Sequence, residues 1–132
     1  MKNSRRMLAV LVCVVMVLSM AVVASAAASK TFFIKDSGGY QCTGRGTISD
    51  NVGTAVFSAT ALPLQPIIPD DACACTVFVL AHNSSGELMG ATTTNGTVYA
   101  SATYKAPNDI ADTYCTFEFN GVDLGGYILY NS

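Results

Sequence analysis

The chain has 132 residues, of which 51% are hydrophobic and 12% are charged, and this length suits one domain rather than two. Part of the apolar character lies at the N-terminus, where Lys2, Arg5 and Arg6 precede an uncharged apolar run over residues 7–23. Beyond this segment, four basic side chains stand against nine acidic ones, a net charge of −5. This charge argues against nucleic acid and anionic membrane surfaces as partners, because both attract basic proteins.

The first 26 residues have the pattern of a secretory signal peptide. The basic start and the apolar run are followed by small residues, and Ala24-Ser25-Ala26 or Ala26-Ala27-Ala28 offers a cleavage site. An uncleaved anchor helix is the alternative, but the apolar run is near the lower limit of about 20 residues for a membrane span. We therefore expect residues 1–26 to be removed and residues 27–132 to form a single secreted domain without a membrane anchor.

The rest of the chain is typical of an all-β fold. It is rich in Thr, Ser, Val, Tyr and Phe, and Gly, Pro and Asn-Gly interrupt it at short intervals. A proline-rich connection over residues 63–71 predicts a crossover between two sheets. The pattern as a whole predicts an antiparallel β-sandwich of about eight short strands. These strands are expected at residues 30–35, 40–49, 53–62, 72–82, 87–94, 97–105, 112–120 and 127–130.

Three local features refine this picture. Gly44 and Gly46 lie on one face of the second strand, where missing side chains indicate a bend, a bulge or a close packing partner. Asn95-Gly96 predicts a two-residue hairpin turn. The run from Thr76 to Ala81 carries no charge and alternates poorly, so we expect it to be covered on both faces.

Four cysteines follow the signal peptide, and an even number in a small secreted chain predicts two disulfides that staple the sandwich. Along a strand, Cys73 and Cys75 point the same way with Cα atoms about 6.6 Å apart, near the upper limit for a bond between them. Each is therefore expected to pair with a distant partner. Two pairings remain open: Cys42–Cys73 with Cys75–Cys115, or Cys42–Cys75 with Cys73–Cys115.

A metal or redox role for these cysteines is disfavoured. His82 lies seven positions after Cys75, and this odd offset places the two side chains on opposite faces of a regular strand, where they cannot share a zinc ion. No helix follows the cysteines to lower the pKa of a thiol. We expect no metal site and no cofactor.

Catalysis is also disfavoured. His82 is the only histidine, so a serine or cysteine hydrolase would depend on it. Its neighbours Ser84 and Ser85 belong to a turn signal and not to a nucleophile elbow. Glu87 and Glu118 alternate with apolar residues as solvent-facing charges do, which argues against a glycosidase pair. The sequence therefore predicts that the protein is not an enzyme.

Binding is the class of function that remains, and six tyrosines supply side chains favoured at interfaces. We expect a binding or structural exoprotein at the cell surface or outside the cell, whose partner is an unknown protein or a cell-surface glycan. The alternative is a protease inhibitor or a bacteriocin-like antibacterial effector. The strand pattern is similar to that of small exported β-sandwich proteins of bacteria, some of which are antibacterial. In the inhibitor, the 63–71 connection would present a rigid binding loop formed by Leu64, Gln65, Ile67 and Ile68.

Overall fold

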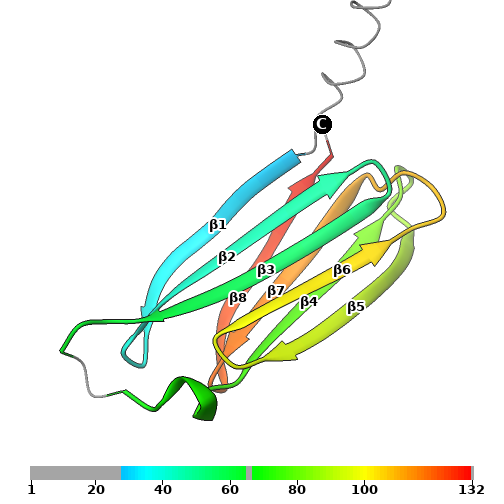
Figure 1. Ribbon diagram of the computed structural model, residues 1–132. Helices are drawn as coiled ribbons and strands as arrows, with labels where there is room; N and C mark the ends of the chain where they lie inside the picture. The colour runs from blue at the N-terminus through cyan, green and yellow to red at the C-terminus, as the bar shows by residue number, and fades with distance from the viewer. Residues whose placement is uncertain (1–27, 65–66, 132) are drawn as a thin grey trace, which may run out of the picture.

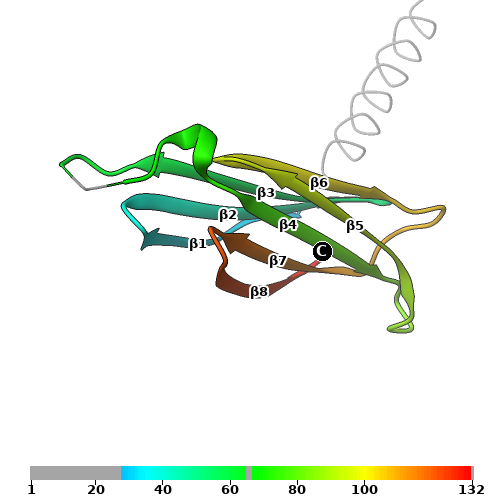
Figure 2. The same ribbon diagram turned by 90° about the horizontal axis from the view of Figure 1, so that it is seen from below.

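The computed structural model describes residues 28–64 and 67–131, which form two antiparallel four-stranded sheets packed face to face (Figure 1, Figure 2). Sheet A has the strand order β1-β2-β3-β6, and sheet B has the order β5-β4-β7-β8. The predicted signal peptide, residues 1–26, and Gln65 lie outside the described residues. The strands are β1 (Ala28–Ser37), β2 (Tyr40–Ser49), β3 (Val52–Ala61), β4 (Cys75–His82), β5 (Leu88–Gly96), β6 (Tyr99–Lys105), β7 (Asp112–Phe119) and β8 (Val122–Tyr130).

The predicted all-β sandwich is confirmed, and so is the crossover. After β3 the chain leaves sheet A, passes through the short 3-10 helix η1 (Asp70–Ala72) and enters sheet B as β4. The fourth strand begins at Cys75, three residues later than predicted, because η1 occupies the residues before Cys73. Among the described residues, none forms a helix long and apolar enough to span a membrane.

The β5–β6 hairpin differs from the prediction. Strand β5 continues through Asn95 and Gly96, so the bend falls on Thr97 and Val98, and the two strands belong to different sheets. A side chain at Gly96 would overlap the carbonyl oxygen of Tyr99. The glycine is therefore required by the close approach of the two strands, and not by a two-residue turn.

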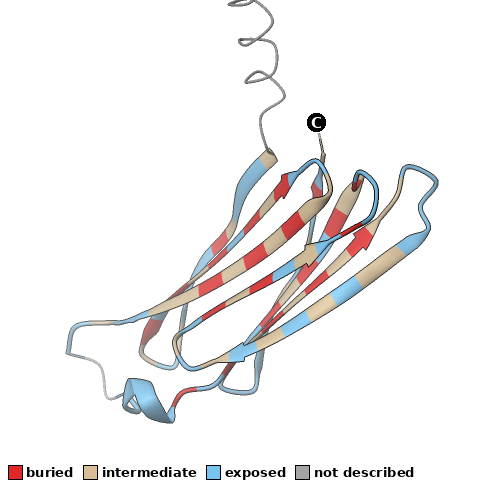
Figure 3. Ribbon diagram, turned by 45° about the vertical axis from the view of Figure 1, so that its right-hand side comes forward, coloured by how far each residue is buried: buried red, intermediate tan, exposed pale blue. Residues whose placement is uncertain are grey.

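Buried and exposed residues alternate along the strands, and the buried ones meet between the sheets (Figure 3). Aromatic rings from both sheets fill this space. Phe57 of sheet A packs against Phe119 of sheet B with ring centroids 5.4 Å apart, and Phe33 meets Phe117 edge-on at 5.3 Å. Burial of these rings away from water supplies most of the force that holds the two sheets together.

The two glycines of β2 make room for rings of β1. A β-bulge between Thr31 and Phe33 places both Phe32 and Phe33 against the core. A side chain at Gly44 would overlap the Phe33 ring, and one at Gly46 would overlap the Phe32 ring. Of the three interpretations offered by the sequence, the close packing partner is therefore the correct one.

The stapling by two disulfides is the part of the predicted fold that the structure does not support. All four cysteines of the described chain are free thiols, and all four are buried: Cys42, Cys73, Cys75 and Cys115.

The strand register explains why the predicted pairings fail. Cys75 lies opposite Phe119, whereas Cys115 lies opposite Val79, so about 13 Å of strand separates Cys115 from the level of Cys75. The Cα atoms of a disulfide lie at most about 7 Å apart. Cys73 is two residues farther still from Cys115. Both predicted pairings require Cys115, and both are therefore wrong for this fold.

Candidate functional site

The outer face of sheet B exposes apolar side chains. Along β4 the inward residues are buried, whereas the outward residues Thr76, Phe78, Leu80 and His82 are only half-buried. The expectation that both faces of this strand are covered is wrong, because a two-layer sandwich covers each sheet on one side only (Figure 2). Uncharged residues on the outer side of β4 therefore face solvent.

Neighbouring strands extend this apolar surface. Leu80 lies opposite Tyr114 of β7, and Tyr114 lies opposite Ile128 of β8. The exposed fractions of Tyr114 and Ile128 are 37% and 48%, which are high for large apolar side chains. Leu88 and Tyr130 occupy the two edges of the row that contains His82. We call this surface the apolar band and define it as Phe78, Leu80, Leu88, Tyr114, Ile128 and Tyr130.

A pocket of about 260 Å³ adjoins the apolar band, between β4, β7 and β8. Two of its lining carboxylates, Glu118 and Asp123, lie opposite each other in the β7–β8 register. Asp123 Oδ1 accepts a hydrogen bond of 2.8 Å from the Gly125 N–H, which fixes that carboxylate. Like charges opposite each other in a sheet repel. This acidic pocket therefore favours a cationic or hydrogen-bond-donating group; its lining is Thr76, Tyr114, Thr116, Phe117, Glu118, Asp123, Gly125 and Gly126.

The wall of the acidic pocket depends on a glycine. The Tyr114 ring lies against Gly126, where any side chain would overlap the phenol group. Tyr114 thus belongs both to the apolar band and to the acidic pocket, and it joins the two surfaces.

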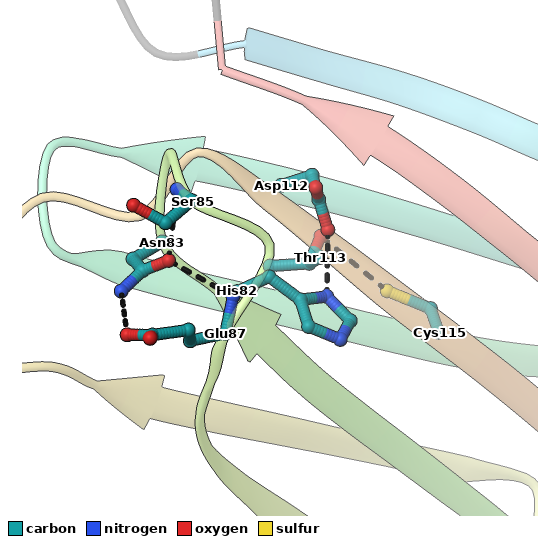
Figure 4. Close-up of polar contacts among 7 residues, drawn as sticks. All are labelled: His82, Asn83, Ser85, Glu87, Asp112, Thr113 and Cys115. Carbon is teal, nitrogen blue, oxygen red and sulfur yellow. Dashed lines mark hydrogen bonds and ion pairs between the residues drawn. The ribbon is translucent and has the colours of Figure 1, made fainter.

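His82 and Asp112 form a polar pair at the other end of the apolar band (Figure 4). His82 Nδ1 lies 2.8 Å from Asp112 Oδ1, and each side chain is 25% exposed. The prediction that His82 faces away from Cys75 is confirmed, since the two occupy opposite faces of β4. A carboxylate that holds Nδ1 in this way orients an imidazole ring, as in catalytic triads.

The nucleophile that such a triad needs is not in place within the described part of the chain, where no hydroxyl or thiol is hydrogen-bonded to His82. Thr113 and Cys115 lie nearby in Figure 4, but both are buried on the inner side of β7, and the Cys115 thiol donates to Thr113 Oγ1 at 3.8 Å. Ser85 belongs to a turn, where its N–H donates to Asn83 Oδ1. The pair therefore offers a polar contact beside the band.

The predicted binding loop is exposed. Leu64 is fully exposed and has a positive φ of 61°, while Ile67 and Ile68 are 37% and 45% exposed. Tyr40, completely buried in β2, ties the loop to the sandwich: its hydroxyl lies 2.6 Å from the Ile68 carbonyl oxygen and 2.7 Å from Asp70 Oδ1. The structure therefore combines exposed apolar side chains with an anchored base.

Three of the four cysteines gather near this anchor. Hydrogen bonding to Cys73, together with burial, raises the pKa of the Tyr40 phenol above its usual range. Burial, with a contribution from nearby Asp36 and the other thiols, raises the pKa of Cys42 to about 11. Burial also raises the pKa of Cys75. The thiols of Cys42 and Cys75 are therefore protonated, and poor nucleophiles or metal ligands, at neutral pH.

Cys115 lies apart from the other thiols, and burial raises its pKa to about 11 as well. Across residues 28–64 and 67–131, no group of three or more His, Cys, Asp or Glu side chains is arranged to hold a metal ion.

Sequence reasoning missed the apolar band and the acidic pocket. The signal for the band was present as the uncharged run of β4, which a two-layer fold cannot cover on both sides. The pairing of His82 with Asp112 had no local signal, because 30 residues separate them. Comparison with models of known protein families and with curated proteins finds no match to this chain.

Proposed function

We propose that the protein is a secreted binding or structural exoprotein, without catalytic activity, that acts through the outer face of sheet B. The observation that carries this proposal is the apolar band. An antiparallel sheet that faces water normally presents polar residues on that side, and Ser and Thr residues predominate on the outer face of sheet A. An exposed row of large apolar side chains, here Leu80, Tyr114 and Ile128, with polar groups beside it is typical of an interaction site, and Tyr114 and Tyr130 are of a residue type favoured at interfaces.

The N-terminal segment supports export with cleavage after Ala26, because a basic start and an apolar run precede Ala24-Ser25-Ala26. The intact mass of the exported protein, measured by mass spectrometry, identifies the cleavage site. We expect a chain that begins at Ala27; protein that stays in the cell with its full N-terminus would contradict secretion.

The binding proposal is tested with the purified protein immobilised and exposed to cell-surface polysaccharides and extracellular proteins. The double variant Leu80→Glu/Ile128→Glu places two charges in the apolar band, and we expect at least a tenfold loss of the retained material. Val122→Glu is the matched control, because Val122 is a 49% exposed apolar side chain at the start of β8 that lies outside the apolar band. Equal retention by the double variant and the wild type would refute the proposal.

We propose one disulfide, Cys42–Cys73, in place of the two expected from the sequence. Both thiols are buried in one cluster, and Cys73 contacts Tyr40, which precedes Cys42 by two residues on the same face of β2. Cys73 lies before β4 begins, where the backbone can adjust. The two thiols lose two protons and two electrons, and the electrons reduce the sulfur–sulfur bond of an acceptor disulfide. Closing this loop stabilises the fold by about 3–4 kcal/mol in the chain-entropy model.

Alkylation of the oxidised, unfolded protein followed by mass spectrometry tests this bond. We expect two alkylated cysteines, Cys75 and Cys115, and four after reduction. Cys42→Ala should leave three thiols free, whereas Cys115→Ala should leave one. Four alkylated cysteines before reduction, or a bond to Cys115, would contradict the proposed pairing.

A second candidate function is favoured by the loop. Leu64 is fully exposed, and the Tyr40 hydroxyl holds the backbone at Ile68, so an apolar segment is presented on a fixed base, as an inhibitor or an antibacterial effector requires. A panel of proteases and a growth assay on bacterial cultures test it. We expect Leu64→Asp to abolish any inhibition and Leu88→Asp, on sheet B, to leave it intact. No inhibition by the wild type at stoichiometric excess would exclude this function.

A further inference from the structure

The outer faces of the two sheets differ in charge. Two basic side chains of the described chain lie on the outer face of sheet A, Arg45 on β2 and Lys105 on β6, and Asp36 of β1 shares that face. Lys30 and Lys35 lie on the inner side of β1, where Lys35 Nζ donates to the Leu124 carbonyl oxygen of sheet B. The strands of sheet B contain no Lys or Arg and carry three carboxylates instead: Asp112, Glu118 and Asp123. The outer face of sheet A therefore carries two cations and one carboxylate, whereas the outer face of sheet B carries three carboxylates and no Lys or Arg.

The outer face of sheet A matches sheet B in a second respect, because its cations stand beside apolar side chains. Exposed Arg45 lies opposite half-buried Val56, and exposed Lys105 lies opposite half-buried Val52. Tyr99, on the same face, is 58% exposed. The outer face of sheet A therefore places cations next to partly exposed apolar side chains. The outer face of sheet B has apolar side chains but no cations.

From this complementarity we propose that the apolar band is covered by a second copy of the chain, which docks the outer face of its sheet A onto the outer face of sheet B. This inference rests on the proposed function and names the partner of the same surface. Arg45 of one copy approaches the acidic pocket of the other, where no Lys or Arg of residues 28–64 and 67–131 pairs with Glu118 or Asp123. A guanidinium group pairs with carboxylates through two parallel hydrogen bonds, and the Tyr114 ring offers it a π face.

The geometry of this contact determines the form of the assembly. The two docking faces are different surfaces of the same molecule, so the contact is heterologous, and each added copy leaves one free face of each kind. Such a contact extends into a ring or a filament rather than stopping at a dimer. Stacked sheets lie about 10 Å apart, which lets Arg45 reach the facing carboxylates. Repeated assembly of this kind is the behaviour of a structural exoprotein.

Charge reversal tests the contact. We expect sedimentation velocity of the wild type, from micromolar to millimolar concentration at low salt, to show species larger than dimers that dissociate at high salt. Glu118→Arg and Arg45→Glu should each give monomers, because each brings like charges together. An equimolar mixture of the two variants should restore the large species, since the two altered faces attract each other and the two unaltered faces still match. Glu87→Arg, in the turn before β5, is the control and should assemble normally.

Several results would overturn the inference. Wild type that stays monomeric at millimolar concentration, assembly that stops at a dimer, or a mixture that remains monomeric would each do so. Capture of a glycan or another protein that depends on Leu80 and Ile128 but not on Arg45 would also overturn it, while leaving the proposed function intact. The proposed function fails separately, if Leu80→Glu/Ile128→Glu retains every ligand of the wild type. Circular dichroism of each variant establishes that it is folded.

Discussion

Sheets A and B present the same kind of surface to each other and different surfaces to solvent. Inward, both contribute buried aromatic and small apolar residues. Outward, sheet B presents the apolar band, whereas sheet A presents mostly hydroxyl groups. The register places these on its outer face: Ser29, Thr31, Thr43, Thr47, Ser49, Thr54, Ser58, Thr60, Ser101 and Thr103.

This difference distinguishes the residues that the fold requires from those that it leaves free to vary. Thr and Phe both suit a half-buried strand position, so β-structure alone does not explain why Phe78 and Leu80 face solvent on β4 while Thr54 and Ser58 do so on β3. The inner faces are constrained by packing, and the outer faces are free to differ. The outer faces are therefore where function is expected to be encoded.

The largest expected effect is a difference in the free energy of unfolding between a ring lost from the inner face of sheet B and a ring lost from its outer face. Phe117, 1% exposed, contacts Phe32, Phe33 and Tyr127, so Phe117→Ala should lower the free energy of unfolding by about 3–5 kcal/mol. Phe78→Ala removes the same ring from the outer face and should cost less than about 1 kcal/mol. Urea denaturation measures both. Equal losses would mean that the outer face is covered in the folded monomer.

The second prediction concerns the pH dependence of stability and compares one buried thiol from each sheet. Burial raises the pKa of Cys42 and of Cys115 from 9.0 to about 11. Between these values the unfolded chain loses protons that the folded chain retains, so the contribution of each thiol to stability is constant below about pH 9 and falls as the pH rises toward 11. Each thiol contributes roughly 1.4 kcal/mol per pH unit in that window.

This decline is measured by urea denaturation in excess reductant between pH 7 and pH 11. Cys115→Ala should make the slope shallower by the contribution of one thiol, and Cys42→Ala should do the same from sheet A. A slope that neither variant changes would assign the decline to other groups.

A smaller loss of stability is expected from substitutions in β2, where the inner and outer sides of the strand are compared. Gly44→Ala pushes a methyl group into the Phe33 ring and should destabilise the protein by about 1–3 kcal/mol. Thr43→Ala changes the outer side of the same strand and should stay within about 0.5 kcal/mol of the wild type. Thermal unfolding of both variants checks the contrast. A neutral Gly44→Ala would show that the ring moves aside at no cost.

The smallest effect compares hydroxyl groups on the two outer faces. Thr54 Oγ1 lies 3.2 Å from Thr103 Oγ1 across the β3–β6 pair, and cross-strand Thr pairs contribute roughly 0.2–1 kcal/mol. Thr54→Ala should cost that amount, measured by urea denaturation. Thr93→Ala, opposite Phe78 on sheet B, should leave the stability unchanged, and a larger loss there would give Thr93 a role in packing.

The strands and the sandwich class could be predicted because turn residues separate the strands, but the order and register of the strands within each sheet could not. Glycine, proline and Asn-Gly located all eight strands, yet β8 begins at Val122 and not at Tyr127 because Gly125 and Gly126 lie within the strand. Gly125 takes a positive φ of 111° beside a register shift. A local pattern does not distinguish such a bulge from a turn.

The predicted disulfide pairings were wrong, and the apolar band was missed, for a related reason. Alternation with Phe117 and Phe119 along β7 indicates that Cys115 points inward, but only the β4–β7 register shows that it lies opposite Val79 and out of reach of Cys75. In the same way, the sequence showed that β4 is apolar but not that only one of its faces is covered. The side of a strand on which a residue lies is a local property. The register between strands and the stacking of the sheets depend on the whole chain.

The β5–β6 hairpin has a consequence for how the chain folds. This hairpin passes from sheet B to sheet A. Sheet A therefore lacks its last strand, β6, until β4 and β5 have folded. Until then the edge of β3 has unpaired N–H and C=O groups, which invite pairing with other chains. Folding should therefore be a single late event with slow kinetics, in the range of milliseconds to seconds typical of sandwiches dominated by distant contacts. A chain cut before Tyr99 would be prone to aggregation.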